Sequence, residues 1–569
     1  MIGPDSDNWI TFNGELYNYV ELRTELQAEG LRFRTASDTE VVLTALRHWG
    51  VEHALTRFNG MWAFAWLDER ERRLVLARDR AGKKPLYMHT SAAGFTFASE
   101  LKGLLAMTGG RYKLNLEVAK AFLDQSLLAT SPHSMLRGIT SLPAGTFLTL
   151  DLSATVLEPV VQEYWRPTTS MDCFDDPDRT SGDKREESLI RDVRDLFHDA
   201  VRLRLRSNVP VGLLLSGGID SSAIASSIHR ETDGEGVAML AAVSSDPRFD
   251  ESPHVDIIAK HLRRDVHKVN IDLGADEAFD LLERVSWHND EPVGSFTTVA
   301  HYKLMEAAKE HGLTVVLSGQ GADELLCGYK KYMAFHVQSL VRQGRVLDGA
   351  AMVIASLRNG TVMRQFNMQE ARRYLPGALT SRRASVLGPA LRDLPRVPVG
   401  LENGMTVQER QALDVTSLSV PALTHYEDRM SMAHGREIRL PFLDVRLIDR
   451  LLGMPISLKM RSGWTKYLFR KAMEGELPKE ITWRKDKQGF SLPQSVWLRG
   501  PLKKWILELF SEEAMVFRHG LLDRSRFLDH YARFSAESEE RGTVWYQEIF
   551  NAISMEIWLR QFEQYVEPA

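Results

Sequence analysis

Near the middle of the 569-residue chain, a short apolar segment runs into a cluster of small residues. The segment spans residues 209–215, and the cluster reads Ser216-Gly217-Gly218-Ile219-Asp220-Ser221-Ser222. Because glycine has no Cβ, the backbone N–H groups of Gly217 and Gly218 can close around an anion. Ser221 and Ser222 fall at the start of the helix that we expect next, where free N–H groups favour phosphate. Asp220 would repel phosphate unless a cation stood between them, so it is a predicted Mg²⁺ ligand.

A second cluster of small residues follows another apolar segment further along the chain. It reads Leu317-Ser318-Gly319-Gln320-Gly321-Ala322-Asp323 and again places an acid behind small residues. We expect Asp220 and Asp323 to hold one Mg²⁺ between them, where the metal would neutralise charge developing on a leaving pyrophosphate. Gln320 can form hydrogen bonds but cannot take up a proton. The alternative for each cluster is a tight turn without a ligand, with Asp323 as a helix cap.

Predicted strands and helices alternate around these two clusters. The strands are residues 209–215, 237–243, 266–271 and 313–317, and the helices are about residues 219–231, 252–262, 274–287 and 298–311. This alternation predicts an α/β fold with a doubly wound parallel sheet. Ligands of such sheets bind beyond the carboxyl ends of the strands, where Leu215, Val243 and Ser318 lie. A further helix is predicted over about residues 186–206, and amphipathic helices follow residue 502.

The composition excludes several classes of protein. A hydrophobic content of 44% and a charged content of 26% are ordinary for a globular domain, and a net charge of −5 argues against a nucleic-acid partner. Two cysteines, Cys173 and Cys327, are too few for a disulfide framework or a cysteine zinc site. No apolar run approaches the ~20 residues of a membrane helix, and the first residues lack a signal-peptide pattern. We therefore expect a cytoplasmic protein that acts on small molecules.

The first cluster resembles the pyrophosphate loop of ATP pyrophosphatases, which activate a carboxyl or carbonyl oxygen as an adenylate. The second resembles the corresponding motif of asparagine synthetases, which usually have Glu where Gln320 stands. That Glu is associated with forming the acyl-adenylate or handling ammonia. Three later stretches resemble the same family: Glu427 to Asp444, Lys466 with Arg470, and Lys487 before Gly489-Phe490.

The resemblance implies a role for each matched residue. Leu215 and Val243 would contact ATP through their backbone. The other residues that would contact ATP are Ser216, Gly217, Gly218, Asp220, Ser221, Ser222, Ser318 and Gly319. Catalytic roles would fall to Gln320, Asp323 and Lys487, the last by stabilising the transition state. Asp428 and Asp444 would either line the acyl-acceptor side of the site or form structural ion pairs.

The first part of the chain resembles the glutaminase domain of the same family. The matching phrases are Phe12-Asn13-Gly14-Glu15, Ser37-Asp38-Thr39-Glu40, Ala77-Arg78-Asp79-Arg80, Lys84-Pro85-Leu86-Tyr87 and Phe97-Ala98-Ser99-Glu100. The resemblance implies an N-terminal-nucleophile fold with αββα layers. Asn13 and Gly14 would form the oxyanion hole, and Glu15 and Asp38 would bind the amino group of glutamine. Asn13-Gly14 taken alone is instead a turn signal.

The glutaminase part departs from the family in one respect. The family's nucleophile is a cysteine at mature position one, whose own α-amino group serves as base. This chain begins with Met1 and has no cysteine before Cys173. We therefore expect a truncated domain that lacks its first strands. Either the true start lies upstream, or this part is a non-hydrolytic remnant, and the chain as it stands has no nucleophile for glutamine hydrolysis.

Together these patterns predict an ATP-dependent amide ligase. We divide the chain into a partial glutaminase domain over residues 1–164, a polar linker over 165–185 and a synthetase domain over 186–569. The expected reaction uses ATP and Mg²⁺ to convert aspartate or a related acid into an acyl-adenylate, which ammonia, in the family normally from glutamine, then attacks. Two alternatives remain: an amidotransferase or cyclase acting on another acid in antibiotic, surface-polysaccharide or peptide biosynthesis, or a non-catalytic assembly protein. Relatives suggest a homodimer.

Overall fold

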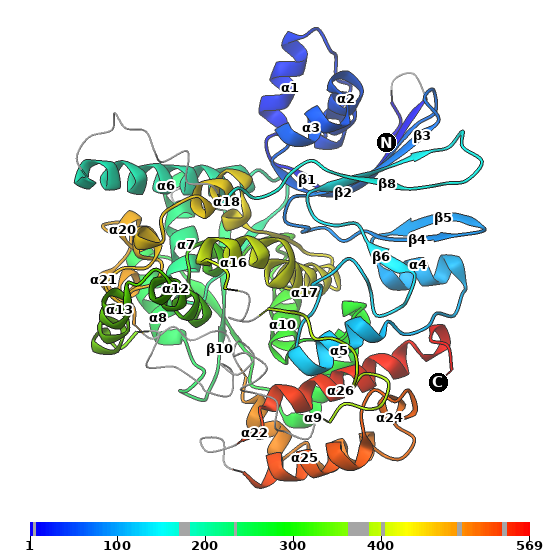
Figure 1. Cartoon of the computed structure of the whole chain (residues 1–569). Coiled ribbons are helices and arrows are strands. Elements are labelled where there is room, and N and C mark those ends of the chain that lie inside the picture. Colours follow the sequence, from blue (N-terminus) through cyan, green and yellow to red (C-terminus); the bar gives the residue numbers. More distant parts are fainter. Residues whose placement is uncertain are drawn as a thin grey trace.

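The computed structural model describes residues 1–3, 7–169, 182–232, 236–361, 386–399, 404–485, 492–537 and 543–568. Two antiparallel sheets with their helices form the N-terminal part, and a parallel sheet wrapped by helices forms the larger C-terminal part (Figure 1). None of the helices in the described ranges has the length and apolar character needed to cross a membrane.

The N-terminal part has four layers. A five-stranded sheet has the order β1-β2-β3-β7-β8, and a three-stranded sheet has the order β5-β4-β6. Helices α1 to α3 cover the larger sheet, and α4 lies beneath the smaller one (Figure 1). The elements are β1 (Asn8–Leu16), α1 (Tyr19–Ala28), α2 (Asp38–Trp49), α3 (Val51–Arg57), β2 (Gly60–Asp68), β3 (Arg73–Arg78), β4 (Tyr87–Ser91), β5 (Gly94–Ala98), α4 (Leu101–Thr108), α5 (Leu116–Gln125), β6 (Ile139–Ser141), β7 (Thr146–Asp151) and β8 (Val160–Glu163).

The alternative of a turn at Asn13-Gly14 is wrong, because both residues lie inside β1. They pair with Ala63 and Trp62 of β2. A Cβ on Gly14 would come within 2.1 Å of the Met61 carbonyl oxygen. The glycine at position 14 therefore allows two strands to approach closely, and it does not mark a chain reversal.

The C-terminal part is built on one parallel sheet, as the sequence predicts. Its strand order is β11-β10-β9-β12-β13, and every neighbouring pair is parallel. The strands are β9 (Val211–Leu214), β10 (Val237–Val243), β11 (Val266–Asn270), β12 (Val315–Leu317) and β13 (Glu437–Arg439), and the intervening helices are α7 (Ile219–Thr232), α8 (Ser252–Leu262), α9 (Ala275–Asn289) and α10 (Thr297–Glu310). The fifth strand, β13, was not predicted.

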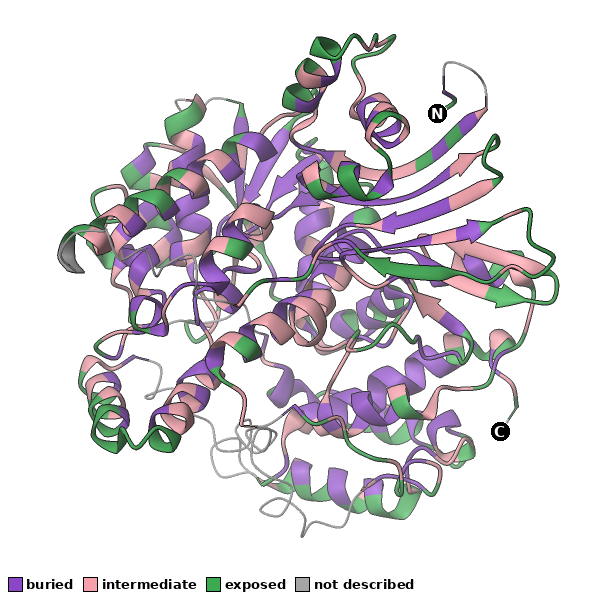
Figure 2. Ribbon diagram, turned by 45° about the horizontal axis from the view of Figure 1, so that its top comes forward, coloured by how far each residue is buried: buried purple, intermediate pink, exposed green. Residues whose placement is uncertain are grey.

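Helices bury both faces of this sheet. Val211 and Leu213 belong to an apolar cluster that includes residues of α6 (Gly182–Arg204) and α7, whereas Val316 and Ile438 belong to a cluster with residues of α10. Figure 2 shows the buried strands in purple. Burial on both faces explains why these strands read as continuous apolar runs in the sequence.

The remaining described helices are mostly short. They are α11 (Ala322–Leu325), α12 (Lys330–Arg342), α13 (Val346–Asn359), α16 (Val407–Leu413), a π-helical turn (Asp414–Leu418), α17 (Val420–Met432), a 3₁₀ turn (Pro441–Leu443), α18 (Val445–Leu452), α19 (Ile456–Lys459), α20 (Tyr467–Ala472), α21 (Lys479–Thr482), α22 (Gln494–Arg499), α23 (Lys503–Leu509), α24 (Met515–Arg518), α25 (Arg524–Ala536), α26 (Tyr546–Gln561) and a final 3₁₀ turn (Glu563–Tyr565).

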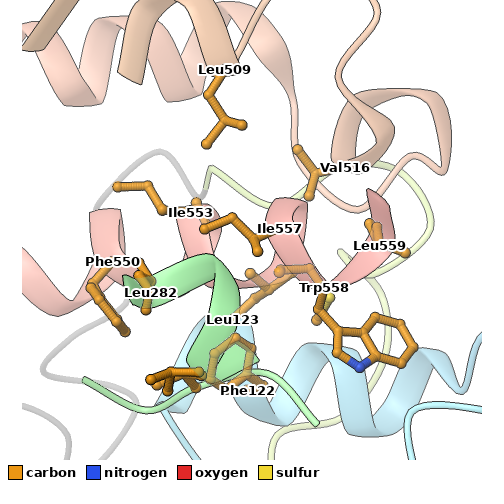
Figure 3. Close-up of a cluster of buried hydrophobic side chains, with 14 of the residues drawn as sticks. Phe122, Leu123, Leu282, Leu509, Val516, Phe550, Ile553, Ile557, Trp558 and Leu559 are labelled. Atoms are coloured by element: carbon orange, nitrogen blue, oxygen red, sulfur yellow. The ribbon is translucent and has the colours of Figure 1, made fainter. Parts of the chain in front are cut away.

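The apolar core runs across the boundary between the two parts. Phe122 and Leu123 of α5 lie in one cluster with Ile553 and Trp558 of the C-terminal helix α26 (Figure 3). The side chain of Asn551 on α26 donates to the carbonyl oxygen of Phe122 at 2.9 Å. The C-terminal helices therefore bind the N-terminal part to the synthetase part.

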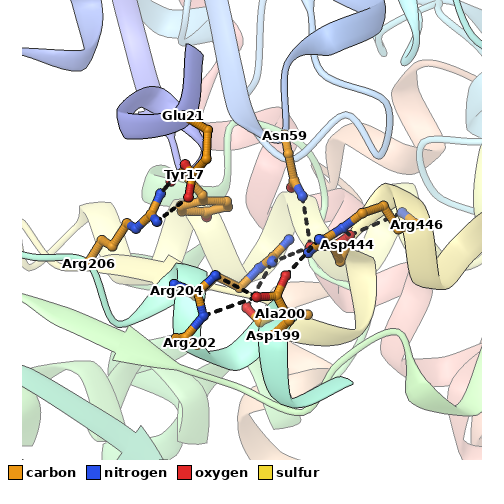
Figure 4. A network of polar contacts seen from close by, with 10 residues as sticks. All are labelled: Tyr17, Glu21, Asn59, Asp199, Ala200, Arg202, Arg204, Arg206, Asp444 and Arg446. Carbon is orange, nitrogen blue, oxygen red and sulfur yellow. Dashed lines mark hydrogen bonds and ion pairs between the residues drawn. The ribbon is translucent and has the colours of Figure 1, made fainter. Parts of the chain in front are cut away.

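Buried ion pairs join the two parts as well. Asp444 accepts hydrogen bonds from Asn59 of the N-terminal part and from Arg204, each at 2.9 Å (Figure 4), and Lys84 donates to Asp428 at 2.9 Å. The pKa of each carboxyl lies well below its usual value because Lys84, Arg204 and other cationic neighbours outweigh the effect of burial. Asp428 and Asp444 therefore both form buried ion pairs.

Candidate active site

The two predicted phosphate loops lie at the topological switch point of the parallel sheet. From β9 the chain proceeds outward through β10 and β11 on one side, and β12 and β13 lie on the other. The first loop follows β9 and the second follows β12, its neighbour in the sheet. In open parallel sheets this crevice at the carboxyl ends of the strands is where ligands bind.

The loops are in direct contact. A Cβ on Gly319 would lie 3.2 Å from the Cβ of Asp220 and 3.3 Å from the backbone nitrogen of Ser221. Gly321 has a φ of +91°, and a Cβ there would come within 2.5 Å of Leu443. Small residues in the second loop therefore allow it to pack against the first.

Hydrogen bonds fix the shape of the first loop. The hydroxyl of Ser221 accepts from the backbone N–H of Ser216 and lies 3.1 Å from the Ser216 hydroxyl. Gly217 has a φ of +65°, and a Cβ there would lie 2.6 Å from the Cβ of His254. Ser222 is fully buried at the start of α7. The loop has both the small residues and the helix start that the sequence indicates.

Lys466 bridges the two predicted metal ligands. Its Nζ lies 2.7 Å and 2.5 Å from the carboxylate oxygens of Asp220 and 2.7 Å from Oδ1 of Asp323. The two carboxylates raise the pKa of Lys466 against the opposing effect of its burial. The acids therefore converge on one cation position, and two carboxylates there form a donor set of the kind that Mg²⁺ prefers.

Two arginines lie in the segment after Lys466, and one of them, Arg484, contacts the first loop. Arg470 donates to the carbonyl oxygens of Thr465 and Thr482 at 2.9 Å and 2.6 Å, and burial lowers its pKa to about 10. Arg484 donates to the carbonyl oxygen of Gly217 at 3.3 Å. Lys487, the predicted transition-state lysine, lies outside the described residues.

The remaining predicted nucleotide residues lie at the same edge of the sheet. The N–H of Leu215 donates to the carbonyl of Leu240 at 2.8 Å, and the carbonyl of Val243 accepts from Ile271 at 3.0 Å. Both residues are thus at or just beyond the carboxyl ends of neighbouring strands.

A second polar group lies behind the Ser318 loop. The Ser318 hydroxyl donates to Oε1 of Glu427 at 2.9 Å, and the Gln320 side-chain amide donates to the hydroxyl of Tyr426 at 3.0 Å. Burial raises the pKa of Glu427 to about 7, against the opposing effects of Lys83 and Ser318. Helix α17 thus presents a buried carboxyl beside the nucleotide loop.

The four predicted glutamine-binding residues lie in the N-terminal part. Asn13 donates to the Ser99 hydroxyl at 3.3 Å, and Asp38 accepts from the N–H of Leu16 at 2.9 Å. Glu15, the neighbour of Gly14 on β1, lies 3.4 Å from Arg439 at the end of β13. Burial raises the pKa of Glu15 to about 7. The predicted glutamine site and the synthetase sheet are therefore linked by an ion pair.

Comparison with known protein families identifies both parts. The asparagine synthase profile matches residues 192–560, and a glutamine amidotransferase domain profile matches residues 1–165. The chain belongs to the asparagine synthase family. Its members use ATP, which agrees with the two loops at the sheet switch point.

The relatives of this chain carry different names. Asparagine synthetase [glutamine-hydrolyzing] 1 of Bacillus subtilis is 31% identical and aligns with 97% of this chain and 86% of its own length. A putative asparagine synthetase [glutamine-hydrolyzing] of Mycobacterium bovis is 30% identical over 87% of this chain and 76% of its own. Amidase chry2 of Gibberella zeae is 27% identical over 90% and 80%.

Similarity to solved structures is weaker. A glutamine phosphoribosylpyrophosphate amidotransferase of B. subtilis, complexed with ADP and GMP, has a TM-score of 0.22 at 14% identity, over 56% of this chain and 62% of its own.

Three features of this asparagine synthase family site were not predicted from the sequence. They are the bridging position of Lys466, the support of the first loop by Arg484, and the burial of Glu427 beside Ser318. Lys466 and Glu427 lie in stretches that resemble the family, but their contacts join segments far apart in the chain. Spacing along the sequence carries no signal for such contacts.

Proposed function

We propose that this protein is an amide ligase that activates the β-carboxylate of aspartate as β-aspartyl-AMP and transfers ammonia to it. The products would be asparagine, AMP and pyrophosphate. The observation that supports this proposal is that Asp220 and Asp323 both pair with the ammonium group of Lys466 at the sheet switch point.

The residues of the two loops have distinct roles in the proposed adenylation. The N–H groups of Gly217 and Gly218 and the hydroxyls of Ser216 and Ser221 bind the β- and γ-phosphates. Mg²⁺ held by Asp220 and Asp323 would supply charge neutralisation at the pyrophosphate leaving group. Lys466, which pairs with both carboxylates, contributes a further positive charge beside them. Burial of Lys466 and partial burial of Asp220 and Asp323 make the interactions of these charges stronger than they would be in water.

Lys487 and the second loop act at the reacting carboxyl group in the proposed scheme. Ser318 and Gly319 flank the nucleotide, and Lys487 offsets negative charge on the α-phosphate. Leu215 and Val243 contact adenosine through their backbone. We propose that ammonia is the nitrogen nucleophile that attacks the acyl-adenylate.

The test is ATP–pyrophosphate exchange with each of a panel of carboxylic acids. We expect exchange with aspartate in the presence of Mg²⁺, and loss of exchange of about 100-fold or more in Asp323→Asn. Failure of aspartate to support exchange would remove the proposal. Glutamate, which is longer by one methylene, serves as the matched control acid, and we expect it to support little exchange.

A second function involves amidation or cyclisation of another acid. Gln320 favours it, because this amide bonds Tyr426 and cannot act as an acid or base. The similarity to a protein named amidase chry2 agrees with this alternative. Exchange with a different acid and not with aspartate would identify it. A protein that binds no ATP by calorimetry would instead be a non-catalytic assembly protein.

A further inference from the structure

Within the described residues, one carboxylate oxygen of Glu427 has a hydrogen-bond partner and the other has none. Its side chain is buried, and Oε1 accepts the hydrogen bond from Ser318 at 2.9 Å. Oε2 is buried and has no hydrogen-bond partner among the described residues. A buried carboxylate oxygen without a donor is unfavourable by about 1–3 kcal/mol unless a ligand or water supplies one. The oxygen therefore has capacity for one further proton donor, next to the loop expected to flank the nucleotide.

The groups around Glu427 come from both parts of the protein. Lys83 lies in the loop after β3, is buried, and has no hydrogen-bond partner at Nζ within the described ranges. The positive charge of Lys83 acts to lower the pKa of Glu427, and the negative charge of Glu427 acts to raise the pKa of Lys83. On its own helix, Glu427 is flanked by Tyr426, which bonds Gln320, and by Asp428, which is paired with Lys84 and Arg429.

His301 completes the surroundings of Lys83. Burial lowers the pKa of this imidazole to about 3, so the ring is neutral. Its Nε2 is buried without a partner in the described part of the chain. In the described part of the chain, Lys83 from the loop after β3, His301 from α10 and Glu427 from α17 thus each have a buried polar atom without a hydrogen-bond partner. Such a concentration at one place indicates a site for a small polar molecule.

Amide formation needs a group that removes a proton. When ammonia attacks an acyl-adenylate, the nitrogen lone pair forms the C–N bond and the nitrogen becomes positively charged. One N–H proton must leave before the amide is stable. Gln320, at the family position usually occupied by Glu, cannot accept it.

We propose that Glu427 removes the proton from the incoming nitrogen nucleophile during amide formation. Oε2 takes the N–H proton as the carbonyl re-forms, and the C–O bond to the phosphate breaks, so that AMP leaves with the bonding electron pair. The proton stays on the Glu427 carboxyl until the products depart. Lys83 acts as a positioning residue that favours the ionised carboxylate. This inference rests on the proposed ligase function.

The two half-reactions separate this role from a structural one. In Glu427→Gln we expect ATP–pyrophosphate exchange to remain within a few-fold of the wild type. Amide formation from ammonium chloride should fall by about 10²–10⁴-fold, the usual contribution of a general base. Hydroxylamine should restore much of the rate, because its adduct is a stronger acid than the ammonia adduct and loses its proton to water more readily.

Three further variants sharpen the test. Glu291→Gln is the matched control, since Glu291 is another glutamate whose pKa is raised by burial, to about 8, and we expect it to leave amide formation unchanged. Glu427→Gln combined with Gln320→Glu places a carboxyl beside Tyr426 instead and should recover at least ~10-fold of the lost rate. In Lys83→Met, the ascending limb of amide formation with pH, measured at constant free ammonia, should move to higher pH.

The possible outcomes are distinguishable. Equal losses of exchange and amide formation in Glu427→Gln, or no loss of either, would overturn the assignment. A loss with ammonia that hydroxylamine does not relieve would overturn it as well. Absence of exchange in the wild-type protein with every acid would instead remove the ligase function itself.

Discussion

The ammonium group of Lys466 lies 2.7 Å from the Asp323 carboxylate, at the position between the two loops where a metal ion is expected. Lys466 is only 3% exposed. It has a φ of +56°, in the left-handed region that non-glycine residues rarely adopt. Its backbone N–H donates to the carbonyl of Leu326 at 3.1 Å. The chain therefore holds this lysine in place although the backbone conformation is unfavourable, which is common at functional sites.

Lys466→Met should make the protein depend on Mg²⁺ for stability. Without the lysine, two carboxylates face each other in a partly buried place, so the free energy of unfolding should fall by about 3 kcal/mol or more. Mg²⁺ should recover part of this loss, because it neutralises the same pair. Thermal unfolding with and without Mg²⁺ measures the effect, and exchange should fall by about 100-fold.

Lys471→Met is the control for this prediction. Lys471 lies on the same helix and pairs with Glu474 at the surface, where an ion pair contributes less than about 1 kcal/mol. The stability of the Lys471→Met variant should be near that of the wild type both with and without Mg²⁺. An equal response of both variants to Mg²⁺ would contradict the bridging role of Lys466.

Gly217→Ala should disrupt the first loop. A left-handed alanine costs about 1–3 kcal/mol, and here the new Cβ would also collide with His254 at 2.6 Å. We expect a larger loss of stability than in Gly236→Ala, whose φ is +75° with nothing within 4 Å. Urea unfolding of the two variants compares them, and ATP–pyrophosphate exchange should be lost only in Gly217→Ala. Equal unfolding free energies would show that the contact with His254 has relaxed.

The sequence predicted the central sheet because strands β9, β10 and β12 are largely buried. Strand β10 was predicted at its observed bounds, Val237–Val243, since an apolar run between turn residues leaves few other assignments. Strand β13 was missed because it has only three residues, Glu437–Arg439, and two of them are charged. It is a strand by virtue of pairing with β12, which no local pattern encodes.

The two loops were predictable as a site because their residue types have a direct chemical meaning. Gly217, Asp220 and Asp323 lie where strand–loop–helix patterning and the switch-point rule indicate. The environment of Glu427 was not predictable, because Lys83 approaches it from a loop more than 300 residues earlier in the chain. Turn signals failed at Asn13-Gly14 for a similar reason, since the partner strand decides the conformation there.

Cys327 should not act as a nucleophile for glutamine hydrolysis. Such a nucleophile would have to be a reactive thiolate, yet burial raises the pKa of Cys327 to about 12 and keeps that thiol protonated. Replacement of Cys327 by serine should therefore leave any glutamate release from glutamine unchanged. Glutamate release, measured beside ammonia-dependent activity in the same preparation, checks this expectation. Turnover of glutamine that survives replacement of both Cys173 and Cys327 by serine would point to a nucleophile other than cysteine.

Glu15 should make the stability of the protein depend on pH near neutrality. Its pKa is raised from 4.5 to about 7 by burial, partly opposed by Arg439. A carboxyl whose folded-state pKa is higher than its unfolded-state pKa favours the folded state at low pH. This contribution disappears as the pH rises from about 4.5 to about 7 and amounts to at most about 3 kcal/mol.

Glu15→Gln should remove that pH dependence. The variant should match the wild type in unfolding free energy at about pH 4.5 and exceed it increasingly toward about pH 8, because the neutral amide avoids ionisation in a buried place. Urea unfolding across this range measures the difference, with Glu52→Gln on the exposed side of α3 as the control. A constant difference between variant and wild type at every pH would mean that the ion pair with Arg439 holds Glu15 ionised throughout. In that case the link between the predicted glutamine site and β13 would be a permanent salt bridge, insensitive to protonation.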